Sequence, residues 1–512
     1  MKNIFKKSLH LALVFLLAGC AGGNDYQCAL PEKPAAVVSF DLPKLATRAG
    51  LDAGNGDKVL NRFKAMVKSG LEGSGDMVDR IFADVAESGL DLENKVYFFT
   101  SEEMSTVGLL AKVLDSSKLE SVVEVLHKQQ LCQAVRETDG CHWTVIGKWL
   151  LAYSDHALLV LGDNKWSDPS KLVRQASMWL RQKEDQGFVS KPDFKKLQAS
   201  HSDVVAYTSL QLFSRQTLAP LTMGLSAELD LNKIKALTAV NFENGKVTFD
   251  IDPLITDDIM NSLIDKKNQT MQPVKGTYLD VFPSKTAFWT TANLKGESFY
   301  KFLREIPAVR KFFDYSDLPI TLDYGRIFDA IDGDVSMAIT DPERGHFIMY
   351  ADVTQTEFLK VFTELRPMIA KTNGMLILED RGENAYCFAT HDGSVLNMHS
   401  GPKIFWLGVK KGRFYFTNRE DLIDSRVLGL SLRDCKWGER VAGQHFFAVS
   451  SWNGLRTFEY LMHQNFLSSV PKIVPPTMDQ VTVESADGKH IRIEWVQTDK
   501  KQNLIQVLLQ NN

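Results

Sequence analysis

The tetrad Leu17-Ala18-Gly19-Cys20 is the part of the sequence to which a definite reaction can be assigned. It follows three lysines and an apolar run from Leu9 to Leu17, far shorter than the roughly 20 residues that a membrane helix needs. A basic start, a short apolar core and small residues before the cut are typical of an export signal. A cysteine at the cut makes the motif a lipobox. We therefore expect removal of residues 1–19 and acylation of the Cys20 thiol, in preference to an ordinary secretory signal or an N-terminal membrane helix.

Acylation of Cys20 predicts how the mature protein is held at the membrane. Two or three acyl chains, at about 0.8 kcal/mol per buried methylene, anchor a protein stably where one chain would not. Residues 20–34 are polar and contain Pro31 and Pro34, as suits a tether. We expect a folded body that begins near Ala35 and is attached to the outer membrane.

The charge balance argues against nucleic acid as a partner. Cleavage removes three lysines, so 59 basic residues become 56 against 63 acidic ones, and the net charge moves from −4 to −7. A protein that binds a polyanion should show a basic stripe or patch, and no such concentration stands out along this chain. The length of 512 residues indicates more than one domain.

Five cysteines remain besides Cys20, and an odd number cannot all pair within the chain. Cys132 and Cys141 bracket the turn-like residues 137–140, which predicts a hairpin disulfide in an oxidising periplasm. The alternative is that they are buried free thiols acting as small hydrophobic side chains. The spacing of the cysteines does not match a metal-ligand set, so we predict no metal site.

Signatures of catalysis are absent from the sequence. There is no Gly-x-Ser-x-Gly elbow, His-Glu-x-x-His helix, phosphate loop or dinucleotide fingerprint. We therefore predict no catalytic residue and no cofactor, although missing motifs do not exclude an enzyme.

Three polar features could still suggest a site. His391, with His399 eight residues on and His142 in the other half, could offer imidazoles to a metal, but residues 391–394 favour a β-turn. The acidic, glycine-rich residues 52–57 lack the glutamate that a calcium loop carries at its twelfth position, which favours a solvated turn. The pairs Glu102-Glu103 and Glu379-Asp380 could do acid–base work, but they stand beside predicted strand ends, where charges are usually solvated.

Aromatic residues recur where predicted strands pass into helices. They are Phe40, Tyr207, Trp289 and Trp452. Because they occupy equivalent positions in a repeated unit, we expect these side chains to pack in the core. The alternative is that they line a cleft that binds a carbohydrate or peptide.

A series of strand-like segments, each followed by an amphipathic helix, runs through the chain twice, about 240 to 250 residues apart. Five features recur in the same order, pairing residues 37–42 with 287–294, 96–100 with 335–340, 109–115 with 347–353, 204–210 with 446–452, and the turn at 244–246 with that at 487–489. This spacing is too long for a solenoid. We predict an internal duplication, with α+β repeat domains over residues 35–275 and 276–512.

Turn chemistry indicates how the strands pair. Asn244-Gly245, Asp392-Gly393 and Asp487-Gly488 are dipeptides that tight hairpins favour. Polar residues end the strands and can cap the next helix, as we expect of Asp115 before residues 118–126 and of Asp352 before residues 357–365. These signals predict an α+β fold of antiparallel sheets with strand-to-helix units packed on one face.

Residues 36–42, 187–197 and 203–207, in this order, resemble a family of uncharacterised lipoproteins of about 500 residues found chiefly in Bacteroidetes. That family is distantly similar to exported cyanobacterial proteins of unknown function. The resemblance covers nearly all of the mature chain and implies an exported, duplicated α+β protein at the outer membrane. It assigns no activity and no role to any residue. Surface-exported lipoproteins of these bacteria tend to carry an acidic cluster just after the cysteine, where this sequence has only Asp25, and this favours the periplasmic face of the membrane.

We expect a lipid-anchored envelope protein without catalytic activity that binds a protein or carbohydrate. The anchor, the repeated scaffold and the missing catalytic motifs favour this interpretation. One alternative is a hydrolase of envelope polymers, which would need two carboxylates about 5 to 10 Å apart in a groove. The other is a structural component of the envelope.

Overall fold

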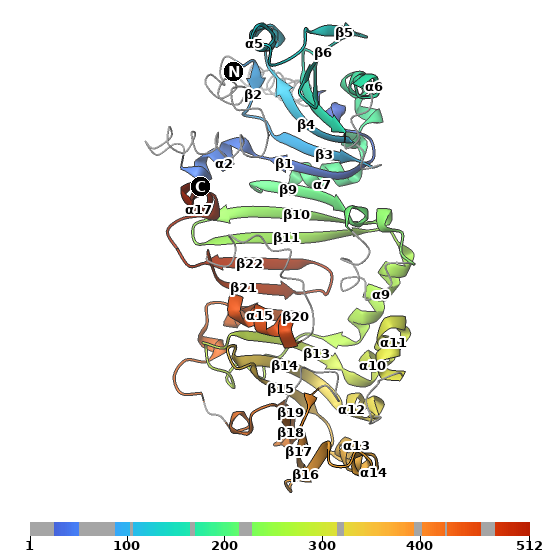
Figure 1. The fold of residues 1–512 in the computed structure, drawn as a ribbon, viewed down its shortest axis with the longest axis vertical. Coiled ribbons are helices and arrows are strands. Elements are labelled where there is room, and N and C mark those ends of the chain that lie inside the picture. The colour runs from blue at the N-terminus through green and yellow to red at the C-terminus, as the bar shows by residue number, and fades with distance from the viewer. Residues whose placement is uncertain are drawn as a thin grey trace, which may run out of the picture. The chain divides into compact units, whose positions relative to one another are not determined.

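The structure is a computed structural model that describes residues 25–50, 88–102, 106–163, 169–213, 228–314, 322–393, 402–424, 427–461 and 477–511. Cys20, residues 52–57, Glu103 and His399 lie outside the described residues. Helices and antiparallel strands alternate along the chain (Figure 1). This confirms the prediction of an α+β fold with antiparallel sheets.

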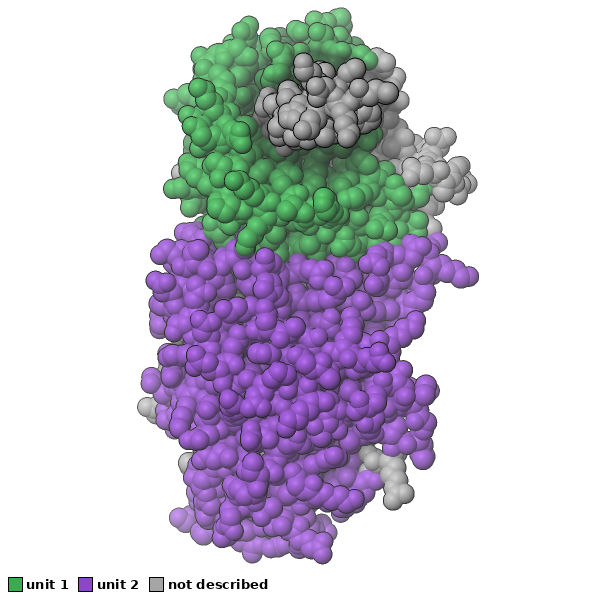
Figure 2. Space-filling view, turned by 180° about the vertical axis from the view of Figure 1, so that it is seen from behind, with its two compact units in different colours: residues 1–212, 235–242, 503–512 green, residues 213–234, 243–502 purple. Residues whose placement is uncertain are grey.

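The chain divides into two compact units, coloured separately in Figure 2. Unit 1 comprises residues 1–212, 235–242 and 503–512, and unit 2 comprises residues 213–234 and 243–502. The predicted border at residue 275 differs from this division. Residues 243–275 belong to unit 2, and the C-terminal residues 503–512 belong to unit 1.

The sheet of unit 1 is antiparallel throughout, in the order β10-β9-β1-β3-β4-β8-β7-β6-β5, with β2 paired to the end of β4. Its strands are β1 (Pro34–Phe40), β2 (Leu90–Asp91), β3 (Val96–Ser101), β4 (Thr106–Val113), β5 (Arg136–Thr138), β6 (Cys141–Ile146), β7 (Trp149–Tyr153), β8 (Ala157–Asp163), β9 (Val204–Ser209) and β10 (Ile234–Glu243).

Unit 1 also contains α-helices and short 3₁₀ helices. They are η1 (Asp25–Ala29), α2 (Leu42–Ala49), α5 (Ser116–Lys128), α6 (Pro169–Leu180), η3 (Glu184–Gln186), η4 (Phe188–Ser190), α7 (Pro192–Ala199), η5 (Leu210–Leu212) and α17 (Leu504–Asn511). The last of these packs against α2, where the Asn503 side chain donates to the Arg48 carbonyl at 2.6 Å.

The sheet of unit 2 follows the order β11-β22-β21-β20-β13-β14-β15-β19-β18-β17-β16, with β12 paired to the end of β13. Its strands are β11 (Lys246–Ile255), β12 (Met271–Gln272), β13 (Phe288–Lys295), β14 (Ile331–Asp341), β15 (His346–Val353), β16 (Leu376–Asp380), β17 (Ala385–Thr390), β18 (Lys403–Lys410), β19 (Arg413–Thr417), β20 (Phe446–Ser450), β21 (Met478–Ser485) and β22 (Ile491–Gln497).

The helices of unit 2 follow its strands in the same alternation. They are η7 (Leu231–Lys233), α9 (Asp258–Gln269), α10 (Gly296–Glu305), α11 (Pro307–Asp314), α12 (Tyr324–Asp329), η8 (Glu357–Leu359), α13 (Lys360–Glu364), α14 (Arg366–Ala370), η10 (Glu420–Leu422), η11 (Leu432–Asp434), η12 (Gly438–Arg440) and α15 (Trp452–Leu461).

Of the two helix caps predicted from the sequence, one is present in the structure and the other is not. The Asp115 side chain accepts from the amides of Ser117 and Lys118 and caps α5, as predicted. The prediction for Asp352 is wrong. Its carboxylate accepts hydrogen bonds from the Tyr278 hydroxyl, at 2.7 Å, and from the Asp334 amide, both far from it in the sequence. The residue that precedes the first turn of the following helix, η8, is Thr356.

The turn between β21 and β22 carries an ion pair that titrates. Partial burial by itself would raise the pKa of Asp487. Hydrogen bonds from the His490 ring and from the amides of Lys489 and His490 outweigh this effect and lower that pKa to about 2. Asp487 in turn raises the pKa of His490, and Asp252 adds to this from 3.0 Å.

These shifts predict how the stability of unit 2 depends on pH. The raised pKa of His490 stabilises the fold below the ordinary histidine value of 6.5, and this is lost as pH rises through the folded pKa. The Asp487 contribution is lost as pH falls below 3.8 towards about 2. We expect His490→Gln to lower the melting temperature at about pH 5.5 and to change it less at about pH 8.5. The pair is exposed, so its effect stays below about 1 kcal/mol. Equal losses at both pH values would contradict this assignment.

Candidate functional site

A group of partly exposed apolar side chains lies together on the sheet of unit 1. It comes from five neighbouring strands, and we call it the open apolar face; it consists of Val38, Phe40, Phe98, Val107, Leu109, Trp149 and Val160. Phe98 is 49% exposed, and Val107 and Trp149 are each 37% exposed. Large apolar side chains exposed together on a soluble domain are typical of an interaction site.

Strand pairing brings these side chains to one face. Phe98 on β3 stands opposite both Val38 on β1 and Leu109 on β4, and Leu109 stands opposite Val160 on β8. Partners across a ladder point to the same side of a sheet. The rings of Phe40 and Phe98 meet edge to face at 5.4 Å.

Alternation along β3 shows that the exposure belongs to one side only. Tyr97 and Phe99 point to the opposite side, where they are 0% and 4% exposed. Phe98, between them, is the exposed member of the run. Within the described part of the chain, the open apolar face is therefore the more exposed side of a sheet whose other side is packed.

A glycine makes part of this surface flat. The Trp149 ring lies over Gly162 of β8, so that a Cβ atom added at Gly162 would stand 2.6 Å from the ring. Any side chain at Gly162 would push the indole off the sheet.

Helix α5 covers only one end of this side of the sheet. Leu119, Val123 and Leu126 of α5 pack on Leu151, Tyr153 and Leu158, and these side chains form one buried cluster. No member of the open apolar face belongs to that cluster.

The corresponding surface of unit 2 is covered. Strands β13, β14, β15, β19 and β18 follow one another there as β1, β3, β4, β8 and β7 do in unit 1. Their cluster of Phe288, Ile339, Phe347 and Phe405 packs against Phe458 and Leu461 of α15. Phe347 is 8% exposed and Phe405 is 6% exposed. The two units thus carry the same kind of apolar surface, and in unit 2 Phe458 and Leu461 of α15 pack against part of it.

The four aromatic residues that the sequence singled out divide between core and surface. Tyr207 and Trp289 are fully buried, as the interpretation of core wedges predicts. Trp452 is partly buried at the start of α15. Phe40 differs, because it belongs to the open apolar face.

The polar candidates of the sequence are not brought together. His391 is exposed beside its turn, and His142 stacks on Tyr153 with ring centroids 5.3 Å apart. Glu102 is exposed, and Glu379 pairs with Arg381 at 2.8 Å on the surface. Among the described residues, no group of three or more His, Cys, Asp or Glu side chains could hold a metal ion.

A charged cluster in unit 2 escaped the sequence analysis. Arg440 bridges Glu484 of β21, at 3.3 Å, and Glu494 of β22, at 3.5 Å. Burial raises the pKa of Glu484 although Arg440 and Arg492 oppose the shift. Glu494, at the centre of β22 between Ile493 and Trp495, was the available signal. Both carboxylates belong to an ion network on the sheet.

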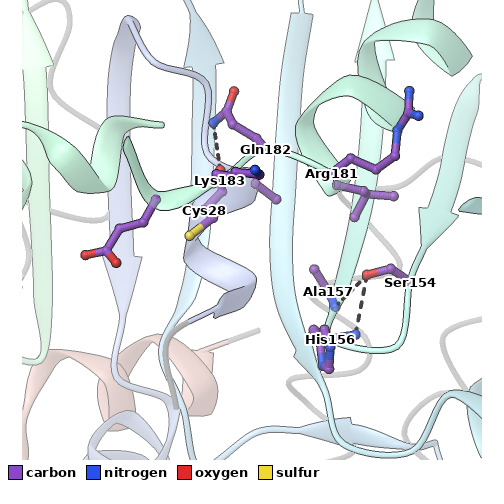
Figure 3. Close-up of a pocket in the computed structure, with 10 residues that line it drawn as sticks. Cys28, Ser154, His156, Ala157, Arg181, Gln182 and Lys183 are labelled. Atoms are coloured by element: carbon purple, nitrogen blue, oxygen red, sulfur yellow. Dashed lines mark hydrogen bonds between the residues drawn. The ribbon is translucent and has the colours of Figure 1, made fainter. Parts of the chain in front are cut away.

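One pocket of about 310 Å³ opens in unit 1, between η1, the β7–β8 turn and the end of α6 (Figure 3). The Gln182 amide donates to the carbonyls of Cys28 and Leu30 at 2.7 and 2.8 Å. The Ser154 hydroxyl accepts from the amides of His156 and Ala157. These two side chains hold the local backbone together, and His156, Arg181, Lys183 and Glu184 complete the polar lining of the pocket.

Cys132 and Cys141 are both buried and not bonded to each other. Cys141 pairs with Thr138 at the turn of the hairpin, whereas the amide of Gln133 donates to Val145, four residues further along β6. That offset is about 13 Å along a strand. A disulfide requires Cα atoms within about 7 Å. The structure therefore does not bring the two thiols together, and burial raises the pKa of each.

Comparisons with known proteins identify the family of the chain but no activity. None of the helices in the described part of the chain is both long enough and apolar enough to cross a membrane. No curated protein matches the chain.

Crystal forms IV and III of a protein named TP0453 are similar at TM-scores of 0.28 and 0.27, with 11% and 10% identity. The alignments cover 44% and 48% of this chain and 79% and 87% of those chains. Scores at this level do not establish a common fold. The model of a domain of unknown function, DUF4836, matches residues 26–447, and the chain therefore belongs to the DUF4836 family.

Proposed function

We propose that this protein is a lipid-anchored envelope protein that binds a partner protein through the open apolar face of unit 1 and catalyses no reaction. The observation that carries the proposal is the contrast between the two units. One apolar sheet surface packs against Phe458 and Leu461 of α15, whereas on its counterpart Phe98 is 49% exposed and no helix among the described residues packs on it. Leaving such a surface in water costs free energy in proportion to its area, and a binding partner would recover it.

We further propose that the two halves arose by internal duplication. Two strand orders support this: β10-β9-β1-β3-β4-β8-β7-β6-β5 in unit 1 corresponds strand by strand to β21-β20-β13-β14-β15-β19-β18-β17-β16 in unit 2. The helices after the two halves correspond as well. Helix α9 packs on α10, and α17 packs on α2.

The proposed location of the protein in the cell rests on its sequence. The tetrad at residues 17–20 supports acylation of Cys20, and the resemblance to Bacteroidetes lipoproteins supports attachment to the outer membrane, on its periplasmic face. The partner would then be another protein of the envelope. A carbohydrate partner gains little support from the open apolar face, because the Trp149 indole N–H is the one side-chain hydrogen-bonding group among its members.

Photo-crosslinking from position 98 tests the proposed function. A benzoylphenylalanine in place of Phe98 is expected to crosslink to a separate polypeptide in intact cells. The same probe in place of Ile404, which is 45% exposed on β18 of unit 2, is the matched control and should not capture that polypeptide. Identical products from both positions, or crosslinks from position 98 only within the chain, would refute the proposal.

A hydrolase is the second candidate, and one observation favours it. Glu484 and Glu494 share Arg440, and Glu484 has a raised pKa, as a general acid needs. A loss of activity on envelope polymers in Glu484→Gln would support a hydrolase.

A further inference from the structure

We propose that the pocket of about 310 Å³ in unit 1, which we call the η1 pocket, binds the phosphoethanolamine headgroup of a membrane lipid. The site is separate from the open apolar face, and its assignment rests on the proposed acylation of Cys20. Two observations carry it: the place where the chain leaves the folded unit, and the charges that line the pocket (Figure 3).

The η1 pocket lies close along the chain to the residue that is proposed to enter the membrane. Cys28 of η1 belongs to its lining and follows Cys20 by eight residues. A fully extended chain advances at most about 3.6 Å per residue, so eight residues span at most about 29 Å. An acylated Cys20 therefore keeps the pocket within that distance of the lipid headgroups, whatever the arrangement of the tether.

Helix η1 is fastened to the core of unit 1, so the tether starts from a fixed point beside the pocket. Tyr26 is 2% exposed, and its hydroxyl donates to the Lys95 carbonyl at 2.8 Å. Gly187 permits the close approach of η1, because a Cβ atom there would stand 2.9 Å from the Cys28 carbonyl oxygen and 2.7 Å from Nε2 of Gln182. The wall of the pocket that carries Cys28 is therefore held in place.

The side chains that line the η1 pocket carry charges of both signs. Arg181 and Lys183 are cationic, His156 is cationic when protonated, and Glu184 is anionic. The Arg181 guanidinium already pairs with Asp139 at 3.1 Å. The side chains of Lys183, His156 and Glu184 form no ion pair with any residue that the structure describes. These three groups are therefore available to a ligand.

This combination of charges suits a zwitterion. A phosphate diester carries one negative charge at neutral pH, and hydrogen bonds from Lys183 and protonated His156 to its oxygens would be charge-assisted. Glu184 repels a phosphate that stands alone but attracts an ammonium group attached to it. Phosphoethanolamine joins one phosphate to one primary ammonium, which has three N–H donors. A choline headgroup has the same charges but no N–H to donate to Glu184.

The size and position of the pocket favour a lipid over a free phosphate ion. Its volume lies at the lower end of the range of about 300 to 1,000 Å³ that small-molecule sites occupy. Ala29, Ala157 and Leu180 give it apolar walls, which suit the carbon atoms of a headgroup. A tether that holds the pocket at the membrane also raises the effective concentration of headgroups.

Flotation with lipid vesicles tests this inference on the full mature chain carrying Cys20→Ser, which cannot bind through acyl chains. The vesicles consist of phosphatidylcholine alone, or of phosphatidylcholine mixed with phosphatidylethanolamine or with phosphatidylglycerol. We expect the mixture with phosphatidylethanolamine to bind most tightly. Lys183→Ala should weaken that binding at least about tenfold, or about 1.4 kcal/mol. Glu184→Gln should abolish the preference for phosphatidylethanolamine over phosphatidylglycerol, because it removes the partner of the ammonium group.

Lys148→Ala is the matched control for charge. Lys148 is exposed in the turn between β6 and β7, at the other end of β7 from the pocket and about 17 Å along the strand. This variant loses the same charge and should bind all vesicles as the parent chain does. Unchanged circular dichroism of each variant shows that the fold persists.

Calorimetry with soluble phosphoethanolamine and with inorganic phosphate separates the two sources of a phosphate group. Tighter binding of phosphoethanolamine, lost in Lys183→Ala, supports the headgroup site. Equal or tighter binding of inorganic phosphate, equal binding to all three kinds of vesicle, or an equal loss in Lys148→Ala overturns it.

The outcomes also distinguish the headgroup site from the proposed function. If position 98 crosslinks to a separate protein but the vesicles are not bound, the proposed function stands and the headgroup site is wrong. If the vesicles are bound as expected but position 98 captures no partner, the headgroup site stands and the proposed binding of a protein is wrong.

Discussion

Replacing Cys20 by serine is expected to release the whole protein from the membrane fraction into the soluble periplasm. Serine keeps the shape of the side chain but lacks the thiol that receives the lipid. Two or three acyl chains at about 0.8 kcal/mol per buried methylene are lost together, and no helix in the described residues offers a substitute anchor. Membrane fractionation and labelling with radioactive palmitate measure the effect.

Cys28→Ser is the matched control, since it removes a nearby thiol and leaves the tetrad at residues 17–20 intact. It should remain in the membrane fraction and incorporate palmitate as the unchanged protein does. Membrane attachment and labelling that persist in Cys20→Ser would show that the lipobox assignment is wrong.

Phe347→Asp should destabilise the protein strongly, whereas the same substitution at Phe98 should leave its stability nearly unchanged. Phe347 is 8% exposed and its ring packs against those of Phe405 and Phe416, so the variant removes a buried ring and buries a charge in its place. We expect a loss of about 4 kcal/mol or more in the free energy of unfolding. Phe98 is 49% exposed, so a charge there stays hydrated, and we expect a change below about 1.5 kcal/mol.

Urea denaturation of the two variants measures this difference directly. The residue type and the new side chain are the same, so only the cover over the two positions differs. A loss for Phe98→Asp comparable to that for Phe347→Asp would show that Phe98 is buried in solution. That result would remove the basis for a binding surface in unit 1.

The strands and much of their pairing could be predicted from the sequence. Residues 96–101 and 204–209 are apolar and β-branched runs of strand length, and they form β3 and β9. Asp115 caps α5 through amides two and three residues away. Such features depend on neighbours in the chain, so the local order of residues is sufficient information.

Features that depend on distant residues could not be predicted in the same way. Asp352 looked like a helix cap but bonds Tyr278, 74 residues away. The charged cluster joins Arg440 to Glu484 and Glu494 from separate elements. No spacing along the chain encodes these contacts.

The sequence by itself predicted a lipobox, and it determined the α+β class and the apolar alternation that gives each sheet an apolar side. It could not show which apolar side is covered, because Phe98 and Phe347 sit in equally apolar strands. Only the tertiary structure decided that, by packing Phe347 in a cluster with Phe288, Phe405 and α15 residues and leaving Phe98 49% exposed. Burial is a property of what packs against a side chain from elsewhere in the fold, and this is why the candidate site emerged only from the folded chain.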